Sequence, residues 1–208
     1  MDLPHTIHAI QLDPADVTLV NSFAGGRGLA AASHASIQDF LHAYRPGEAA
    51  VVVLNLGAAE EDALAALGQL RERGVLAPAI AVAEAPSTEL TVGAMQRGAV
   101  SVLPRPLDRS ALERELARAL EMEEQERAIR ARRETIASRL ASLNEGEREV
   151  LTRLMAGTAN KKIAAELRIG LRTVELRRAK ILKKLGAKSL AEMVRLVVLA
   201  EPERLYGE

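Results

Sequence analysis

The positively charged side chains of this chain gather near its C-terminal end. All six lysines lie between residues 161 and 188, together with four arginines. Ammonium and guanidinium groups concentrated on one short stretch bind polyanions, above all the phosphates of nucleic acids. The alternative is a solvated charged helix face that needs no partner. The lysines are Lys161, Lys162, Lys180, Lys183, Lys184 and Lys188.

The formal net charge of zero conceals a difference between the two ends of the 208-residue chain. Residues 1–120 carry a net charge of −5, residues 121–140 are neutral, and residues 141–208 carry +5. The first 120 residues contain no lysine at all. Such an asymmetry indicates that the C-terminal part has an anionic partner.

Three other groups of residues could suggest chemistry, yet each favours a structural role. The four histidines have no third ligand placed with them, so we expect no metal ion. The glycine-rich run at 24–28 lacks the spacing of a phosphate loop and follows a helical pattern, which predicts a turn. The acids at 60–62 are typical of a helix start. The histidines are His5, His8, His34 and His42.

Composition excludes several classes of function. The chain has no cysteine, which rules out disulfides, thiolate metal sites and thiol nucleophiles. Four aromatic residues and no tryptophan argue against a stacked flavin or a sugar platform. The longest apolar run, 49–59, is far shorter than the roughly 20 residues of a membrane span, and the N-terminus has an acid where a signal peptide has a basic residue. We expect a soluble, cytoplasmic protein without a cofactor.

The elements that would position these groups begin with a segment of alternating patterns. From residue 7 to about residue 120, short apolar runs alternate with helical patterns in five consecutive units. Five such units predict an α/β domain with a parallel sheet covered by helices on both faces. The expected strands are 7–10, 29–33, 50–55, 79–83 and 100–103. The expected helices are 14–23, 36–44, 60–73, 87–97 and one that starts at 108.

The last of these helices has no stop signal. Residues 110–140 contain neither proline nor glycine, and their content of alanine, arginine, glutamate and leucine predicts one helix of roughly 30 residues. Met122, Ile129 and Ile136 repeat every seven residues, but the complementary heptad positions are mostly polar. Because only one of the two core positions of the heptad is apolar, two interpretations stay open. The helix either pairs two chains weakly in parallel or is a solvated connector.

From residue 143 the pattern changes to short helices separated by small turns. We expect helices at 145–156, 160–167, 171–184 and 189–200. Two helices joined by three or four residues with a glycine have helix-turn-helix geometry, although a generic helical bundle shares this pattern. In the third helix, Val174, Ile181 and Leu185 form a narrow apolar stripe and basic residues crowd the rest. A bundle helix needs no such charge, whereas a helix in the major groove of DNA does.

Residues 143–200 resemble the LuxR-type DNA-binding domain, which has four helices. The segments EREVL, NKKIA, RTVE, KKLGAKS and AEMVRL fall in register with that family. There are two departures, because Gly170 and Leu171 replace the usual Ser-Pro type of start of the recognition helix, and Arg177 stands where a histidine is frequent. Glycine is an acceptable residue before the first turn, so we expect the helix to form.

The resemblance implies which residues would meet DNA. Residues 171–184 would be the recognition helix, in which contacts to bases specify the sequence and contacts to phosphates position the protein. The side chains that face base edges would be Arg172, Glu175, Leu176 and Ala179. Those that hold phosphates would be Lys161, Thr173, Arg177, Arg178, Lys180 and Lys183. A homodimer would use the closing helix and the partial seam, through Met193, Val194, Val197, Val198, Met122, Ile129 and Ile136.

Residues 6–120 resemble a receiver domain, so the whole chain is similar to a FixJ/NarL-type response regulator. The segments RERGVLAPAIAV and AMQRGAVSVLPRPLD carry this likeness. It implies a flavodoxin-like, five-stranded parallel sheet of order 2-1-3-4-5, with the reactive site beyond the carboxyl ends of the central strands. It also implies three segments, which are a receiver at 1–120, a helical linker at 121–142 and a DNA-binding domain at 143–208.

The residues at the positions of the receiver's phosphorylation chemistry are degenerate. A receiver needs two acids that hold magnesium, an aspartate that accepts the phosphoryl group, a hydroxyl, an aromatic and a lysine. The matching residues are Gln11, Leu12, Asn55, Ala83, Val102 and Arg105, with Asp13 beside them. Asn55 is no nucleophile, and neither Gln11 nor Leu12 offers a carboxylate to a hard cation. Asp13 alone is a poor magnesium cage and is at least as well suited to cap the following helix.

These features predict a non-enzymatic transcriptional regulator that binds double-stranded DNA as a homodimer without aspartate phosphorylation. Two alternatives stay open. In the first, the degenerate receiver binds a protein partner and DNA binding is secondary. In the second, the protein is still a signalling regulator that depends on phosphorylation.

Overall fold

The computed structural model describes residues 5–57 and 60–201 of the chain. The chain divides into two compact units, Met1–Arg127 and Ala128–Glu208, which we call the sheet unit and the helical unit. One helix, α5 (Arg109–Ala141), contributes residues to both units. Within the described residues, no helix combines the length and the apolar character that a membrane crossing requires.

The sheet unit is built on five parallel strands in the order β2-β1-β3-β4-β5. This confirms the fold class and strand order expected from the sequence. The strands are β1 (Thr6–Ile10), β2 (Ala30–His34), β3 (Ala50–Asn55), β4 (Ala79–Ala83) and β5 (Ala99–Pro104). β2 begins at Ala30, one residue later than expected. Its first residue that pairs with β1 is Ala30, which lies opposite Thr6. β3 and β4 are buried over almost their whole length, as strands covered on both faces must be.

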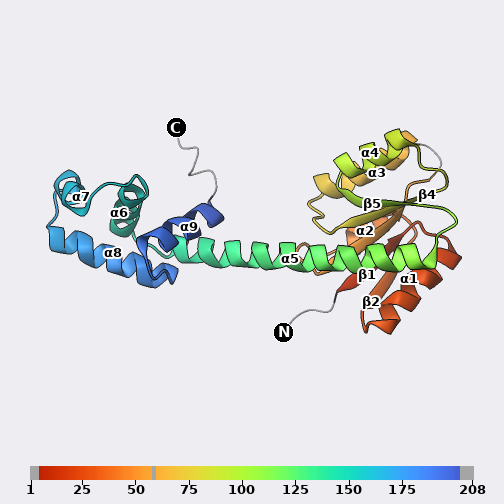
Figure 1. Cartoon of the computed structure of the whole chain (residues 1–208), viewed down its shortest axis with the longest axis horizontal. Helices are drawn as coiled ribbons and strands as arrows, with labels where there is room; N and C mark the ends of the chain where they lie inside the picture. The colour runs from red at the N-terminus through yellow and green to blue at the C-terminus, as the bar shows by residue number, and fades with distance from the viewer. Residues whose placement is uncertain (1–4, 58–59, 202–208) are drawn as a thin grey trace. The chain divides into compact units, whose positions relative to one another are not determined.

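Helices cover both faces of this sheet (Figure 1). Besides α5, they are α1 (Pro14–Gly26), α2 (Ile37–Ala43), α3 (Glu60–Glu72) and α4 (Thr88–Gln96). α1 and the first part of α5 pack on one face, through side chains such as Val20 and Leu116. α2, α3 and α4 pack on the other face, around Phe40 and Leu67. The carboxyl ends of the strands are left to loops, which is where a doubly wound fold places its sites.

Local signals in the sequence start and stop these helices. Asp13 caps α1, because its Oδ1 accepts a hydrogen bond from the backbone N–H of Asp16 at 3.0 Å. Ser36 and Ser87 cap α2 and α4 in the same way. Only the last two residues of the glycine-rich run at 24–28 form the turn that the sequence predicts, because α1 continues through Gly26.

α5 confirms the long helix expected at 110–140. In the sheet unit it buries Leu112 and Leu116, and in the helical unit it buries Ile136 and Leu140. The residues between these two buried stretches are mostly exposed. The helix is therefore held by apolar contacts at both of its ends and is solvated between them.

The helical unit contains the four further helices that the sequence predicts. They are α6 (Glu145–Met155), α7 (Asn160–Leu167), α8 (Leu171–Leu185) and α9 (Leu190–Ala200). A capping box starts α6, where Asn144 and Glu147 exchange side-chain and backbone hydrogen bonds. Gly186 ends α8 with a left-handed backbone, φ 71°, which glycine adopts without steric cost. The core of this unit joins side chains of α5 to those of α6, α7, α8 and α9.

Candidate nucleic-acid interface and the carboxyl edge of the sheet

α8 presents one face to the core of the helical unit and the rest of its surface to solvent. Val174, Ile181 and Leu185 are fully buried, which confirms the narrow apolar stripe expected from the sequence. Gly170 occupies the N-cap position and supplies no side-chain hydrogen bond to the first turn. α8 packs against both α6 and α7, which fixes it as the second helix of a helix-turn-helix pair.

The side chains expected at base edges lie together on the outer face of α8. Arg172, Glu175, Leu176 and Ala179 are all exposed, and the pairs Arg172–Leu176 and Glu175–Ala179 each lie four residues apart, one turn along the helix. Leu176 keeps 56% of its surface exposed, which is unusual for leucine. Glu175 forms no ion pair with another described residue. This face thus offers a guanidinium, a free carboxylate and an apolar group, which are groups that base edges in the major groove can pair with.

Most of the residues expected at phosphates are accessible around that face. Lys161, Lys180 and Lys183 are exposed and form no ion pair with a described residue. Thr173 and Arg178 are half-buried. Unpaired ammonium groups beside a helix-turn-helix are available to neutralise phosphates and to release counterions.

Two further cations of α8 are used inside the helical unit. Arg177 donates from Nη1 to the carbonyl oxygen of Gly146 at 3.3 Å. Lys184 donates from Nζ to Oε2 of Glu147 at 2.6 Å and to the carbonyl oxygen of Ser142 at 3.0 Å. The hydrogen bond from Lys184 holds the pKa of the buried Glu147 carboxyl below its ordinary value, against the opposing effect of burial. The sequence alone did not reveal this pair, because its members lie 37 residues apart.

The residues expected to pair two chains divide into two groups by burial. Three of them are occupied in the core of the helical unit: Met193, Val197 and Ile136. Four keep part of their surface accessible: Met122, Ile129, Val194 and Val198. Any contact between two chains at these positions is therefore limited to the second group.

An ion-pair cluster occupies the carboxyl edge of the sheet. Arg105, in the loop after β5, contacts Asp13 through Nη1, and its Nη2 lies 2.7 Å from Oδ2 of Asp16. Hydrogen bonds from the backbone of Asp16 and from Arg105 hold the pKa of Asp13 below its ordinary value. Asp16 is buried in the first turn of α1, and burial raises the pKa of its carboxyl, an effect that Arg105 opposes. The only cation expected at this site is therefore held between two acids.

The remaining residues at the phosphorylation positions bring no further acid to this edge. Asn55 ends β3 half-buried, and Ala83 ends β4 buried. Gln11 is exposed and Leu12 half-buried after β1, while Val102 is half-buried within β5. Sequence reasoning missed Asp16, whose position three residues after the cap is also that of an ordinary helix start. In the described part of the chain, no cluster of three or more histidine, aspartate or glutamate side chains is suited to a metal ion.

Three of the four histidines lie in polar contacts of the sheet unit. Nδ1 of His8 lies 3.0 Å from Nε2 of His34, and Nε2 of His8 lies 2.9 Å from Oε1 of Glu48. Burial lowers the pKa of both imidazoles. His5 contacts the buried carboxylate of Glu123 on α5 at 2.6 Å. These contacts join β1 to its neighbours and give the histidines a structural role.

Comparison with known proteins finds relatives of the helical unit and of the whole chain. Residues 141–197 match the luxR family of bacterial regulatory proteins, and all of α6, α7 and α8 lies inside the match. The solved structure of the response regulator StyR superposes with a TM-score of 0.78 at 26% identity, over 94% of this chain and 98% of that chain. Full-length FixJ from B. japonicum gives a TM-score of 0.51 at 29% identity, over 97% of this chain and 99% of that chain.

A sequence relative extends the likeness over almost the whole chain. The transcriptional regulatory protein FixJ of Azorhizobium caulinodans is 34% identical over 198 residues, which cover 93% of this chain and 92% of that protein. The match therefore includes the sheet unit as well as the helix-turn-helix. The chain belongs to the FixJ-like response regulators, which are DNA-binding transcriptional regulators with a C-terminal domain of the luxR family.

Proposed function

We propose that this regulator recognises specific double-stranded DNA sequences as a homodimer and does so without phosphorylation of an aspartate. The observation that carries the proposal is the pairing of Arg105 with Asp13 and Asp16 in a site where residue 55 is an asparagine. In this proposal, residues 1–120 form a degenerate receiver, residues 121–142 a connector, and residues 143–208 the DNA-binding domain.

The chemistry of the carboxyl edge supports the absence of phosphoryl transfer. An acyl phosphate needs a carboxylate nucleophile, and the amide of Asn55 is not one. Magnesium needs charged oxygen ligands, but Asp13 and Asp16 are both engaged by Arg105.

The outer face of α8 supports direct readout of a DNA sequence. Arg172, Glu175 and Leu176 would lie against base edges, where a carboxylate accepts from cytosine and an apolar side chain contacts the methyl group of thymine. Lys180 and Lys183 would lie against phosphates and fix the position of the helix. Sequence specificity would thus come from residues that do not pair with other described side chains.

Accessible apolar side chains support pairing of two chains on DNA. Val194 and Val198 lie on α9 and keep part of their surface free. Ile129 lies on the solvated stretch of α5 and is 48% exposed. Two copies of α9 would bring two recognition helices to two half-sites, as dimeric helix-turn-helix proteins require.

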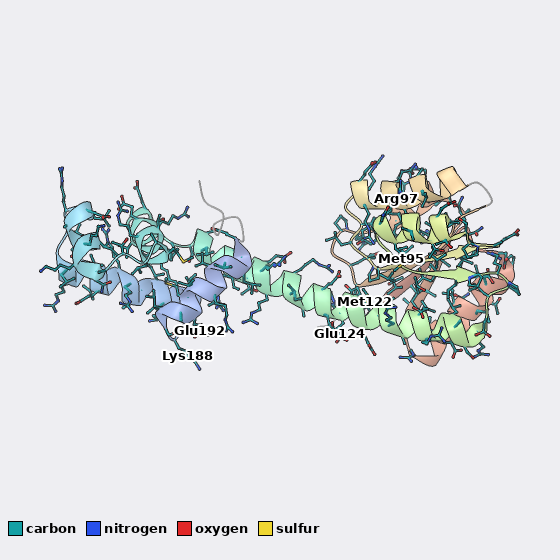
Figure 2. All side chains as sticks on the ribbon, turned by 45° about the horizontal axis from the view of Figure 1, so that its top comes forward. Met95, Arg97, Met122, Glu124, Lys188 and Glu192 are labelled. Atoms are coloured by element: carbon teal, nitrogen blue, oxygen red, sulfur yellow. The ribbon has the colours of Figure 1, made fainter. Side chains whose placement is uncertain are left out.

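A protein partner at the sheet unit is the second candidate function. α4 carries two exposed apolar side chains one turn apart, Val92 at 49% and Met95 at 52% exposure. Figure 2 shows Met95 on this helix, at the surface of the sheet unit. Neighbouring exposed apolar groups are typical of interaction sites. In this alternative the degenerate receiver would receive its input from the partner, and DNA binding would be secondary.

Labelling with a small phosphodonor tests the main proposal. The purified full-length protein is incubated with radiolabelled acetyl phosphate, with and without magnesium. We expect no label in the wild type and none in Asn55→Asp, because Gln11, Leu12 and Ala83 still lack their chemical roles. Stoichiometric labelling of the wild type would contradict the proposal and favour a phosphorylated regulator.

Two further measurements separate the dimer from the partner-binding function. Sedimentation with a duplex that carries two half-sites should show two chains on each duplex, and a single chain would contradict the dimer. The partner function is favoured if Val92→Glu with Met95→Glu abolishes regulation in cells while the affinity for DNA in vitro is unchanged.

A further inference from the structure

A cavity of about 400 Å³ lies at the carboxyl edge of the sheet, and none of the three residues of the ion-pair cluster lines it. Its walls come from the ends of β1 and β3 and from α2 and α3. Ligands of doubly wound α/β folds bind outside the carboxyl ends of the strands. The volume lies within the range of small-molecule sites, roughly 300 to 1,000 Å³.

Three carboxamide side chains line this cavity, those of Gln11, Asn55 and Gln69. The amides of Gln11 and Gln69 form no hydrogen bond with a described residue. From the described residues Asn55 accepts one, a long contact of 3.5 Å from the backbone N–H of Gly57. Each carboxamide has two donor hydrogens and an acceptor oxygen, so most of this capacity remains open to a ligand.

The backbone fixes the position of one of these amides. Gln11 has a left-handed backbone, φ 54°, which is uncommon for a residue other than glycine. Its N–H donates to the carbonyl oxygen of His34 at 2.9 Å, which ties the residue to the end of β2. Such conformations persist where the surrounding structure determines them, and they cluster at ligand sites.

The other described residues of the lining are uncharged. Ile37, Leu56 and Ala65 contribute apolar surface, and no acidic or basic side chain is among the lining residues that the structure describes. A charged ligand would gain no counter-charge from these residues, whereas a neutral polar ligand would replace water by the three amides. The described lining contains no aromatic ring either, so hydrogen bonding rather than stacking would orient the ligand.

We infer that this cavity binds a small uncharged molecule that carries a lactam or carboxamide group. Such a group presents an N–H donor beside a carbonyl acceptor, and a carboxamide side chain can pair with both at once. The inference goes beyond the proposed function, because binding to this site is measured without DNA and does not depend on how α8 reads a sequence.

The test uses 2-pyrrolidinone and uracil as neutral lactam probes and inorganic phosphate as the anionic comparison. Each is titrated into the full-length, ¹⁵N-labelled protein while backbone amide resonances are followed. We expect both lactams to shift the resonances of Gly57, Ala65 and Ala66 in a saturable way, and we expect phosphate to leave them unchanged.

Variants on α3 locate the binding. Gln69→Leu removes one amide, and Ala65→Leu fills the cavity from an exposed helix position that tolerates a larger side chain. Both variants should lower the affinity for the lactams at least tenfold, while the resonances of residues outside the cavity keep their positions. Gln96→Leu, an exposed glutamine of α4 outside the cavity, should leave the affinity unchanged. The inference is overturned if neither lactam binds, if phosphate produces the same shifts, or if the shifts persist in Ala65→Leu.

Discussion

A buried carboxylate lies against a basic side chain in each unit, Glu147 in the helical unit and Asp16 in the sheet unit, yet the two carboxyl groups differ in the direction of their pKa shift. In the helical unit, Glu147 accepts from Lys184 at 2.6 Å and from the backbone N–H of Asn144 at 3.0 Å, and its pKa is lowered. In the sheet unit, Nη2 of Arg105 lies 2.7 Å from Oδ2 of Asp16, but this oxygen accepts no regular hydrogen bond from a described residue, and burial raises the pKa of Asp16. The two pairs differ in how well hydrogen bonds satisfy the charged form.

This difference separates a structural ion pair from a site in which two carboxylates compete for one guanidinium group. The pair in the helical unit joins α8 to α6 and leaves Lys180 and Lys183 free on the outer surface. The cluster in the sheet unit places two acids around one arginine, so one acid is always less well compensated than the other. Unsatisfied buried polar atoms are uncommon in folded proteins, and they are frequent at functional sites.

Removal of the cation in the helical unit should have the largest effect. Lys184→Met leaves the buried Glu147 without its partner, and we expect the helical unit to lose about 3 kcal/mol of stability. This value is at the lower end of the range for breaking a buried ion pair, because Lys184 is partly exposed. Hydrogen exchange of the amides of α6 and α8 measures it. The double variant with Glu147→Gln should recover most of the loss, and Lys188→Met should change nothing. Equal stability of Lys184→Met and wild type would show that the pair is not structural.

Removal of the cation in the sheet unit should cost less and should change the pH dependence. We expect Arg105→Met to lower stability by about 2 kcal/mol, because the side of the cluster at Asp13 is open to water. A carboxyl group whose pKa is raised in the folded state stabilises the fold at pH values below its unfolded pKa of 3.8. This stabilisation is lost as the pH rises through the pKa of the folded state.

The pH profile of stability checks this second prediction. Without Arg105, the pKa of Asp16 should rise further, so the loss of stability on going from acid toward neutral pH should be larger than in the wild type. Arg73→Met, a change at an exposed arginine of the same unit, should keep the profile of the wild type. A profile that stays unchanged in Arg105→Met would remove Asp16 from the cluster.

The free carboxylate of α8 should affect specificity and leave stability unchanged. Glu175→Ala should relax the preference at one base pair by roughly 1 to 3 kcal/mol, because a carboxylate accepts from the amine of cytosine. The salt dependence of binding should stay the same or become slightly steeper. Binding to a panel of duplexes with single-base substitutions decides it. A loss that is uniform over the panel would remove Glu175 from the residues that read bases.

The free lysines of α8 should give the smallest effect, and one that does not depend on sequence. Lys180→Ala or Lys183→Ala should weaken binding to every duplex about fivefold at 0.15 M salt and should lower the slope of log affinity against log salt by about one unit each. Lys162→Ala is the matched control, since Lys162 lies 4.0 Å from Glu166 and is not among the expected contacts. Unchanged slopes at both positions would contradict the docking of α8 in the major groove.

Periodic patterns within single elements were sufficient to predict most of the fold. The apolar run of β3, the missing stop signal in α5 and the stripe at Val174, Ile181 and Leu185 each record the burial of one element along its own length. The boundaries shifted by up to three residues, as at the end of α1, because the end of a helix or strand depends on caps and register. The strand order came from the family resemblance, since no single element encodes its neighbours.

The partners of particular side chains were decided only by the tertiary structure. The sequence placed Arg105 at the degenerate site, but only the tertiary structure shows that the loop after β5 reaches the start of α1, where Asp16 joins Asp13. Likewise, Met193 and Val197 belong to an apolar helix in the sequence, and only the structure shows them buried in their own core. The physical reason is that a local pattern fixes which face of an element is buried. The packing of elements far apart in the chain decides which distant side chain contacts that face. It also decides how many hydrogen bonds a charged group receives.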